Sequence, residues 1–398
     1  KGAGPPSGGV ELDVAAAKTP EAIVVDADRD RRFMGAALAI GRRNLGQTWP
    51  NPAVGAVIVR DTPSGPLVVG RGWTAEGGRP HGEPLALAEA GELARGATCY
   101  VTLEPCSHHG RTRPCADALV AAGVARVVSA VEDPDPRVSG NGHARLAAAG
   151  IAVTTGVCAK AARRDHAGHF TRVLKGRPHV QLKLATSADG MIGRAGAPGF
   201  AITGETVRGR VHLMRAEADA IMIGIGTALA DDPMLTCRLA GLERRSPIRV
   251  VVDGAARLPL DSALVESIGE APLWLVVDAR APADRRAALE EAGATLVEVP
   301  RDATGRSDLV AALRAIAGEG ITRLMVEGGA TLARALLDGG LVDEAMVFSA
   351  PVTIGAGGLP AFATAGPEAI EASGRYVLAA AGRIGTDEYR HWWVKDWE

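Results

Sequence analysis

The sequence predicts an α/β protein with two domains. With 398 residues, the chain is longer than a single hydrophobic core usually organises. Short apolar segments alternate with amphipathic segments along two stretches, a pattern typical of strands and helices packed in layers. A basic segment with Gly and Pro, AARRDHAGHFTRVLKGRPHV, joins the two stretches. We therefore expect a flexible leader at residues 1–27, a first domain at 28–175 and a second domain at 176–398.

The first domain is expected to be a hairpin followed by alternating helices and strands, which gives α/β/α layers. Its first helix is marked by acidic residues in the first turn and a glycine at the end. Two apolar strands follow, separated by the turn-forming sequence DTPSG. The expected helices lie at residues 28–46, 81–94, 114–123 and 142–150, and the expected strands at 53–59, 66–72, 97–103, 124–134 and 151–157.

The second domain continues the alternation without a repeat of fixed period. Several of its strands end in Asp or Gly, and ligands usually bind at the carboxyl edge of an open α/β sheet. We therefore expect a binding site at that edge. The expected strands lie at residues 179–185, 219–226, 248–254, 273–279, 323–329, 344–355 and 388–396, and the expected helices at 211–218, 286–293, 308–320 and 331–340.

The overall charge favours a protein that handles small molecules. The net charge is −2 at pH 7, whereas proteins that bind nucleic acids or anionic membranes normally carry a basic excess. No apolar run approaches the roughly 18 residues that a membrane span needs. Five cysteines and a leader unlike a signal peptide indicate intracellular thiols or metal ligands rather than a disulfide framework. We expect a cytoplasmic protein with neither a nucleic-acid nor a membrane partner.

A histidine and two cysteines form a candidate metal site. His81 and Glu83 belong to the sequence HGE at an expected helix start, and Cys106 and Cys115 each follow a proline. One imidazole and two thiolates suit a tetrahedral zinc ion whose fourth position holds water. We expect Cys106 at the end of a strand, directly after Pro105, and Cys115 where the next helix begins. A helix N-terminus suits both cysteines, because its dipole and free N–H groups favour the thiolate. Glu83 is expected to move the proton of the zinc-bound water without binding the metal itself.

This pattern is similar to the signature of zinc deaminases, His-x-Glu followed by Pro-Cys-x-x-Cys. Here the eight residues SHHGRTRP separate the two cysteines, instead of two residues. The longer loop is expected to place Ser107, His108, Arg111 and Arg113 beside the metal, where they suit an anionic substrate.

Two alternatives use the same residues. One is a disulfide between Cys106 and Cys115, and the other is a closed structural zinc site that takes His108 or His109 as a further ligand. The structural zinc site leaves the HGE sequence unexplained. The remaining histidines have no ligand-like spacing and are interpreted as ordinary surface or core residues: His143, His166, His169, His179, His212 and His391.

The second domain offers two weaker signals. Lys183 is an isolated cation in the apolar run VQLKLA, a costly position unless it faces a ligand or an acid. The alternative is a lysine on a solvated strand face. In VEGGATLARAL two glycines separate a strand from a helix, and free N–H groups at such a helix start bind phosphates, although a plain packing turn has the same pattern. The sequence GIG is not a Rossmann fingerprint, because no third glycine follows at the required spacing.

Taken in order, the motifs resemble a known family. TWPNPAVGAVIV, HGEPLAL, YVTLEPCSHHGRTRPC and EDPDPRVSGNG resemble the deaminase half of the bifunctional riboflavin-biosynthesis deaminase–reductases. RPHVQLKLATSADGMIG, AITGETVRGRVHLMRAEADAIMIGIGTALADDPMLT and LMVEGGATLARALLDGGLVDE resemble the reductase half. The resemblance runs from about residue 30 to the end. It implies a cytidine-deaminase-like α/β/α domain followed by a dihydrofolate-reductase-like α/β domain.

The resemblance also implies two consecutive reactions. The first domain, with one Zn²⁺, would hydrolyse the 2-amino group of 2,5-diamino-6-(5-phosphoribosylamino)pyrimidin-4-one. The second would use NADPH to reduce the ribosyl group of the product to ribityl. The implied partner is therefore a phosphorylated pyrimidine, and the implied assembly is a homo-oligomer.

Individual residues follow from the same resemblance. It makes His81, Cys106 and Cys115 the zinc ligands and Glu83 the proton shuttle. The implied substrate-binding residues are Asn51, His108, Lys183, Arg215, Leu235, Arg238 and Glu327. The implied NADPH-binding residues are Ala185, Ala201, Thr227, Asp231, Gly329, Ala330, Thr331, Leu332, Ala333, Arg334 and Ala335.

Two positions in the second half depart from the family pattern. Ala188 stands where the family usually has Leu, and Ala201 where it commonly has Trp. They motivate an alternative hypothesis, a working deaminase whose reductase half is impaired or retuned. A nucleic-acid deaminase module is a third hypothesis, which the acidic balance and the lack of a basic, aromatic-interleaved stripe disfavour.

Overall fold

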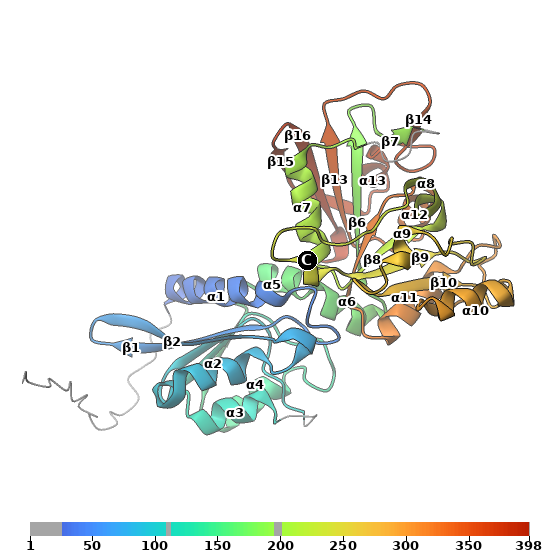
Figure 1. Ribbon diagram of the computed structural model, residues 1–398. Helices are drawn as coiled ribbons and strands as arrows, with labels where there is room; N and C mark the ends of the chain where they lie inside the picture. The colour runs from blue at the N-terminus through green and yellow to red at the C-terminus, as the bar shows by residue number, and fades with distance from the viewer. Residues whose placement is uncertain (1–25, 109–112, 195–200, 398) are drawn as a thin grey trace, which may run out of the picture.

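The computed structural model describes residues 26–108, 113–194 and 201–397 and separates them into two domains around two large sheets (Figure 1). Elements of the first domain, blue to green, lie mostly below those of the second, light green to red. Among these residues no helix combines the length and the apolar character needed to cross a bilayer.

The first domain is a five-stranded sheet between two layers of helices, as predicted. The hairpin partners β1 and β2 are antiparallel, β1 also pairs antiparallel with β3, and the remaining strands are parallel. In sheet order the strands are β2 (Gly65–Trp73), β1 (Gly55–Thr62), β3 (Thr98–Val101), β4 (Arg126–Ser129) and β5 (Ala152–Thr155). The helices are α1 (Ala27–Gly41), α2 (Gly82–Ala90), α3 (Cys115–Ala122), α4 (Asn141–Ala148), α5 (Ala159–Asp165) and α6 (Ala167–Lys175).

The second domain is built on a nine-stranded mixed sheet. The strands from β11 to β13 run parallel, and β16 and β15 add an antiparallel pair at one end. In sheet order they are β11 (Thr295–Glu298), β10 (Leu273–Val277), β9 (Ile248–Val252), β8 (Ala220–Gly224), β12 (Arg323–Glu327), β6 (His179–Ser187), β13 (Glu344–Ala350), β16 (Asp387–Val394) and β15 (Tyr376–Ile384). The helices are α7 (Glu205–Ala216), α8 (Ile225–Asp231), α9 (Ala263–Glu266), α10 (Ala283–Glu291), α11 (Leu309–Gly318), α12 (Ala330–Asp338) and α13 (Glu368–Ala372). A small separate sheet pairs β7 (Met191–Arg194) with β14 (Gly358–Pro360).

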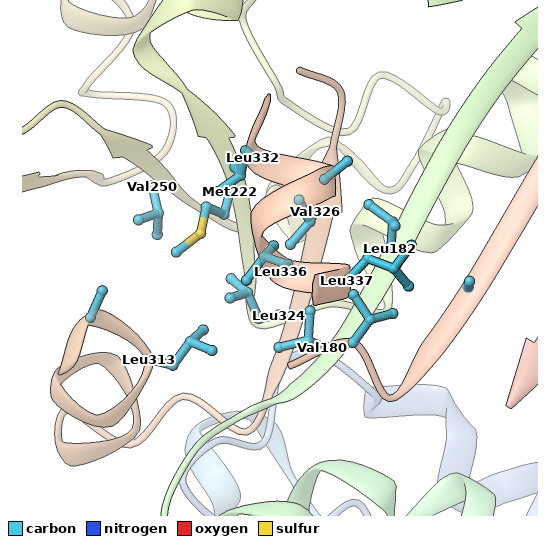
Figure 2. Close-up of a cluster of buried hydrophobic side chains, with 14 of the residues drawn as sticks. Val180, Leu182, Met222, Val250, Leu313, Leu324, Val326, Leu332, Leu336 and Leu337 are labelled. Atoms are coloured by element: carbon cyan, nitrogen blue, oxygen red, sulfur yellow. The ribbon is translucent and has the colours of Figure 1, made fainter. Parts of the chain in front are cut away.

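The core of the second domain shows why the predicted pattern folds this way. Side chains two residues apart on β6 and β12 point to the same face, where leucines of α12 cover them (Figure 2). Val180 and Val326 have no measurable exposure, and neither has Leu336 of α12. The opposite face of the sheet packs against α7 through a separate cluster that includes Val207, Met325 and Phe348. Residues between the core positions, such as Lys183, therefore face α7.

Several boundaries differ from the expectation. The first helix ends at Gly41 and passes into a 3-10 turn (Arg42–Asn44), short of the expected stop at Gly46. The basic joining segment contains two helices, α5 and α6, since its apolar residues pack against the first core. The strands β7, β11, β14 and β15 were not expected, because they are short or rich in small, exposed residues.

The two domains meet along α5, α6 and the loop before β1. The Arg323 guanidinium donates to the Arg164 carbonyl at 2.7 Å, and Arg172 donates to the Ala317 carbonyl at 2.9 Å. Arg245 of the second domain donates to the Leu45 carbonyl at 2.7 Å. These bonds tie the main chain of each domain to a side chain of the other.

Candidate active sites

The three expected zinc ligands come together. Their ligand atoms all lie within 4.8 Å of one another, although the residues span His81 to Cys115. His81 Nδ1 is 3.3 Å from the sulfur of Cys115 and 3.7 Å from the sulfur of Cys106. Ligands of a tetrahedral zinc, bound at about 2.0–2.3 Å, sit at similar separations from one another. Both cysteines are free thiols, so the disulfide alternative is not formed.

Local structure explains how each ligand is placed. His81 is the N-cap of α2, and Cys115 opens α3 directly after Pro114, as expected. Cys106 lies in the loop between β3 and α3, because β3 ends at Val101, earlier than the expected strand. The Cys115 main-chain N–H donates to the Cys106 sulfur at 3.3 Å, so the start of α3 faces this thiol as well. Hydrogen bonds from Cys115 and His81 hold the pKa of Cys106 well below its ordinary value.

Glu83 lies beside these ligands in the first turn of α2. Its carboxyl group is buried, with 3% of the residue exposed, and burial raises its pKa above the ordinary value. Its Oε2 atom is buried without a hydrogen-bond partner, and so is Nε2 of His81. Buried polar atoms are almost always paired, so orphaned atoms here indicate a site completed by a ligand. The donor set and the orphaned carboxylate fit a zinc ion with its water.

The loop behind Cys106 is fixed by Glu104. This carboxylate is buried and accepts four main-chain N–H groups at 2.8–3.2 Å, from Asp133, Gly140, Gly142 and His143. A Cβ on Gly142 would lie 2.0 Å from the Pro105 carbonyl oxygen, so the loop packs directly against the residue before Cys106. Glu104, Glu132 and His143 also form a second group with metal-like spacing. Because Glu104 is already saturated with N–H donors, we interpret this group as a structural clamp.

The expected substrate residues of the first domain contact or adjoin the segments that carry the zinc ligands. The Asn51 amide donates to the Gly78 carbonyl at 3.0 Å, on the turn that leads into His81. His108 is partly buried, and its Nδ1 atom lacks a partner. The Ser107 carbonyl accepts a bond from Arg145, and Arg113 is exposed. Two loop residues of the sequence analysis, His109 and Arg111, lie outside the described residues.

In the second domain, the predicted lysine faces an acid. Lys183 on β6 is in register with Glu327 on β12, and its Nζ atom is 3.7 Å from a Glu327 oxygen. Arg215 of α7 binds the same carboxylate with two nitrogens, at 2.6 and 2.9 Å. All three side chains are between 11% and 13% exposed. The solvated-face alternative for Lys183 is therefore wrong.

Positive charge exceeds negative charge in this cluster. Although burial opposes it, Arg215 and Lys183 lower the pKa of Glu327 to about 2, so the carboxylate is ionised. Arg238 adds a third cation, and its guanidinium lies 3.5 Å from the Thr236 hydroxyl. Leu235, in the same loop, is 4% exposed and has φ +57°, an unusual conformation for leucine. Three cations against one carboxylate suit an anionic ligand such as a phosphate.

One member of this cluster was missed by the sequence analysis. His212 lies on α7 one turn before Arg215, and its Nδ1 atom accepts the main-chain N–H of Arg238 at 3.3 Å. Its spacing of three residues from Arg215 puts both on one helix face, which is the signal that sequence reasoning could have used. Its partner, however, is a main-chain amide that carries no sequence signature.

The glycine turn between β12 and α12 forms a cradle. Gly328 and Gly329 have φ +70° and +80°, and a Cβ on Gly329 would lie 2.9 Å from the Thr227 hydroxyl. The first N–H groups of α12 have no partner within the helix, as at any helix start. This cradle fits the phosphate of a dinucleotide and joins two predicted NADPH positions, Thr227 and Gly329.

The other predicted NADPH-binding residues differ in how far their side chains are exposed. The side chains of Leu332 and Ala333 are buried in the core, and the Ala333 N–H donates to the Gly329 carbonyl at 3.0 Å. Arg334 donates to Asp338 at 2.7 Å on the exposed side of α12. Ala185 lies on β6 two residues beyond Lys183, in register with Phe348. The remaining positions are exposed or partly exposed: Ala201, Asp231, Ala330, Thr331 and Ala335.

Both halves of the chain match models of known enzyme domains. Residues 27–131 match the cytidine and deoxycytidylate deaminase zinc-binding region, and residues 178–380 match the RibD C-terminal domain. The fold and the two sites therefore define a zinc deaminase joined to a reductase.

Whole-chain relatives show the same combination. The riboflavin biosynthesis protein RibD of Escherichia coli is 39% identical over 91% of this chain and 99% of its own length. The protein of the same name from Aquifex aeolicus is 38% identical over 82% and 88%. A solved structure of Acinetobacter baumannii RibD has a TM-score of 0.81 at 35% identity, covering 93% of this chain and all of that one. The deaminase/reductase structure from Thermotoga maritima has a TM-score of 0.79 at 29% identity, covering 92% of this chain and 99% of that one.

The chain belongs to the RibD family of riboflavin-biosynthesis proteins. It is a bifunctional enzyme with a zinc-dependent deaminase domain and an NADPH-dependent reductase domain, and it carries out two consecutive steps of riboflavin biosynthesis. The predicted fold class is confirmed for both domains.

Proposed function

We propose that residues 28–175 hydrolyse the 2-amino group of 2,5-diamino-6-(5-phosphoribosylamino)pyrimidin-4-one and release ammonia. Residues 176–398 then reduce the ribosyl side chain of the product to ribityl with NADPH. The observation that carries the proposal is the convergence of His81, Cys106 and Cys115 beside the orphaned carboxylate of Glu83. The surplus of positive charge around Glu327 supports a phosphorylated substrate for the second step.

In the deaminase site each residue has a separate task. His81, Cys106 and Cys115 hold the zinc, which supplies a Lewis acid that makes water acidic enough to react at neutral pH. Glu83 takes a proton on the oxygen that has no protein partner and passes it to the leaving amine. Asn51 and His108 bind the pyrimidine beside it.

In the reductase site the residues bind and orient. Lys183, Arg215 and Arg238 attract the phosphorylated substrate, while Glu327 and Leu235 shape its pocket. The glycine cradle and α12 would hold NADPH, which would supply the hydride. The NADPH-binding residues are Ala185, Ala201, Thr227, Asp231, Gly329, Ala330, Thr331, Leu332, Ala333, Arg334 and Ala335. Because the cluster is largely buried, the charges act in a medium of low dielectric constant.

An intact reductase is favoured over an impaired one. Ala188 and Ala201, the two departures from the family pattern, are both exposed. Neither interrupts the contacts among Lys183, Arg215 and Glu327.

The test supplies purified, zinc-loaded protein with the diaminopyrimidinone ribosyl phosphate and follows ammonia release and NADPH oxidation separately. We expect both signals, with oxidation dependent on prior deamination. Ammonia without oxidation would support the impaired reductase, and NADPH titration would then show whether the cofactor binds at all. Neither signal would contradict the substrate assignment.

Two further properties are part of the proposal. A homo-oligomer is supported by β15, which ends the nine-stranded sheet and exposes Val377 and Leu378, since an apolar sheet edge favours pairing with another strand. Light scattering coupled to size-exclusion chromatography tests it, and a monomer at micromolar concentration would contradict it. A cytoplasmic location is tested by cell fractionation.

A further inference from the structure

The loop that carries Arg238 is strained and needs external support. Two of its residues that are not glycine have positive φ, Asp232 at +39° and Leu235 at +57°. Such conformations cost on the order of 1–3 kcal/mol each and persist only where neighbours hold them. The loop must therefore be fixed by bonds from outside.

Four bonds hold the loop between Met234 and Arg238. Arg249 donates to the Met234 carbonyl at 3.3 Å and Arg215 to the Thr236 carbonyl at 3.0 Å. The Cys237 N–H donates to the Ser246 hydroxyl at 3.0 Å. The fourth bond runs from the Arg238 N–H to Nδ1 of His212 at 3.3 Å. Among these four, only the bond to imidazole depends on a group that titrates near neutral pH.

The bond to His212 requires a neutral ring, because a protonated Nδ1 has no lone pair to accept the Arg238 N–H. The surroundings favour that state. Burial, followed by the charges of Arg215 and Arg238, lowers the pKa of His212, while the Thr236 carbonyl and Glu327 act in the opposite direction. Lys183 adds a further cation to the cluster, 3.7 Å from Glu327.

We propose that His212 is a positioning residue of the reductase: its neutral imidazole fixes the main chain of Arg238, so that Arg238 and Arg215 together present their guanidinium groups to the phosphate of the substrate. This role rests on the proposed reductase function. Arg238 is exposed, and among the described residues its guanidinium has one hydrogen bond, the 3.5 Å contact with the Thr236 hydroxyl. The anchored main chain is therefore what restricts the positions that its side chain samples.

The proposal predicts effects on affinity rather than on the chemical step. In His212→Leu the Arg238 N–H loses its acceptor, and we expect KM for the deaminated phosphoribosyl substrate to rise about tenfold, with kcat within twofold. A tenfold change corresponds to about 1.4 kcal/mol. In His212→Asn the side-chain oxygen replaces Nδ1 as acceptor, so KM at neutral pH stays within twofold of the wild type.

A pH series separates the imidazole from the substrate. The substrate phosphate, with a second pKa near 6, titrates in the same way for all three proteins. Below the pKa of His212, KM of the wild type rises toward that of His212→Leu, whereas His212→Asn lacks this added rise because its oxygen accepts at every pH. NADPH binding, measured by titration, is the control for folding of the second domain in each variant, because ammonia release reports only on the first domain.

Hydrogen exchange of the peptide containing residues 234–240 tests the same bond without turnover. Exchange should be faster in His212→Leu than in the wild type and unchanged in His212→Asn. Unchanged KM and unchanged exchange in His212→Leu would overturn the proposal, as would a His212→Asn protein that behaves like His212→Leu. Absence of NADPH oxidation in the wild type would contradict the proposed reductase function, and the exchange result would still decide whether His212 holds the loop.

Discussion

The two sites of this enzyme are prepared for their ligands in opposite ways. The deaminase site brings three ligand atoms together beside a buried carboxylate oxygen of Glu83 that has no partner, so it is complete only with a cation and its water. In the reductase site Glu327 already pairs with Arg215 and Lys183, and what remains is surplus positive charge. The first site therefore requires a cation, whereas the second already contains paired charges and attracts an anion. Mutations should therefore affect chemistry at the first site and both stability and affinity at the second.

Glu83→Gln gives the largest expected effect. The amide keeps the shape of the side chain but cannot carry the proton, and general acid–base catalysis contributes about 10²–10⁴-fold to a rate. We expect ammonia release to fall by that factor while zinc content, measured by atomic emission, stays at one ion per chain. NADPH oxidation with deaminated substrate should not change. Normal deamination by this variant would show that the assigned role of Glu83 is wrong.

Glu327→Gln should destabilise the second domain. Removing one partner of a buried ion pair costs about 3–5 kcal/mol. Because Glu327 is 12% exposed, we expect the free energy of unfolding to fall by about 3 kcal/mol, the lower end of that range. Urea unfolding followed by far-UV circular dichroism measures the change. The matched control is Glu298→Gln, whose carboxylate is 52% exposed and pairs with Arg286, and which should change stability by less than about 0.5 kcal/mol. Equal effects of the two variants would contradict the buried cluster.

The carboxylate of Glu327 should also make the stability of the fold depend on pH. Its pKa falls from 4.5 to about 2 on folding, so its contribution to stability is complete above pH 4.5 and is lost as the pH falls through about 2. The unfolding midpoint of the wild type should therefore decline more steeply than that of Glu327→Gln between pH 4.5 and 2. Parallel curves would mean that the charge of Glu327 does not stabilise the fold.

A glycine from each site tests whether the two halves fail independently. In Gly142→Ala the new Cβ would lie 2.0 Å from the Pro105 carbonyl oxygen, which is too close for a real contact. In Gly329→Ala the alanine would have φ +80°, and its Cβ would lie 2.9 Å from the Thr227 hydroxyl. We expect a loss of about 1–3 kcal/mol in each case. Gly142→Ala should reduce only ammonia release, and Gly329→Ala should weaken NADPH binding about tenfold by titration.

Two other glycines provide matched controls. Gly35 and Gly226 lie in helices, and a Cβ at either position would have no atom within 4 Å. Alanine at these positions should preserve both activities. Loss of both activities from either site variant would indicate that the domains do not fail separately.

Arg334→Ala gives the smallest expected effect. Its ion pair with Asp338 is exposed, at 40% and 56%, and such pairs contribute about 0.5 kcal/mol or less. If α12 binds the cofactor through main-chain N–H groups, KM for NADPH should change less than about threefold. A larger increase would show that the guanidinium itself binds NADPH.

The features that could be predicted from the sequence are those determined by residues close to one another in the chain. His81 and Cys115 were placed at helix starts because proline and polar residues mark such ends locally, and Lys183 was noticed because a cation is rare in an apolar strand. The bond between Cys106 and the start of α3 could not be located from the sequence, because the N–H that donates to the Cys106 sulfur belongs to Cys115, nine residues further on. His212 was missed because its partner is a main-chain amide that only the tertiary fold brings close.

The strands likewise divide into those that the sequence predicted and those that it did not. Buried strands such as β8 and β10 have apolar runs that identify them. The edge strand β15 is mostly exposed and rich in Ala, so its sequence carries little strand signal, and only pairing with β16 makes it a strand.

The position of β16 has a consequence for how the chain is made. Residues 387–394 lie between β13 and β15, so the second sheet stays open on one side until this late segment has left the ribosome. The first sheet uses nothing beyond residue 155 and is available for folding much earlier during synthesis. A nascent chain stalled before residue 387 would therefore carry a finished first sheet and an exposed edge on β13, which is open to pairing with a strand of another chain.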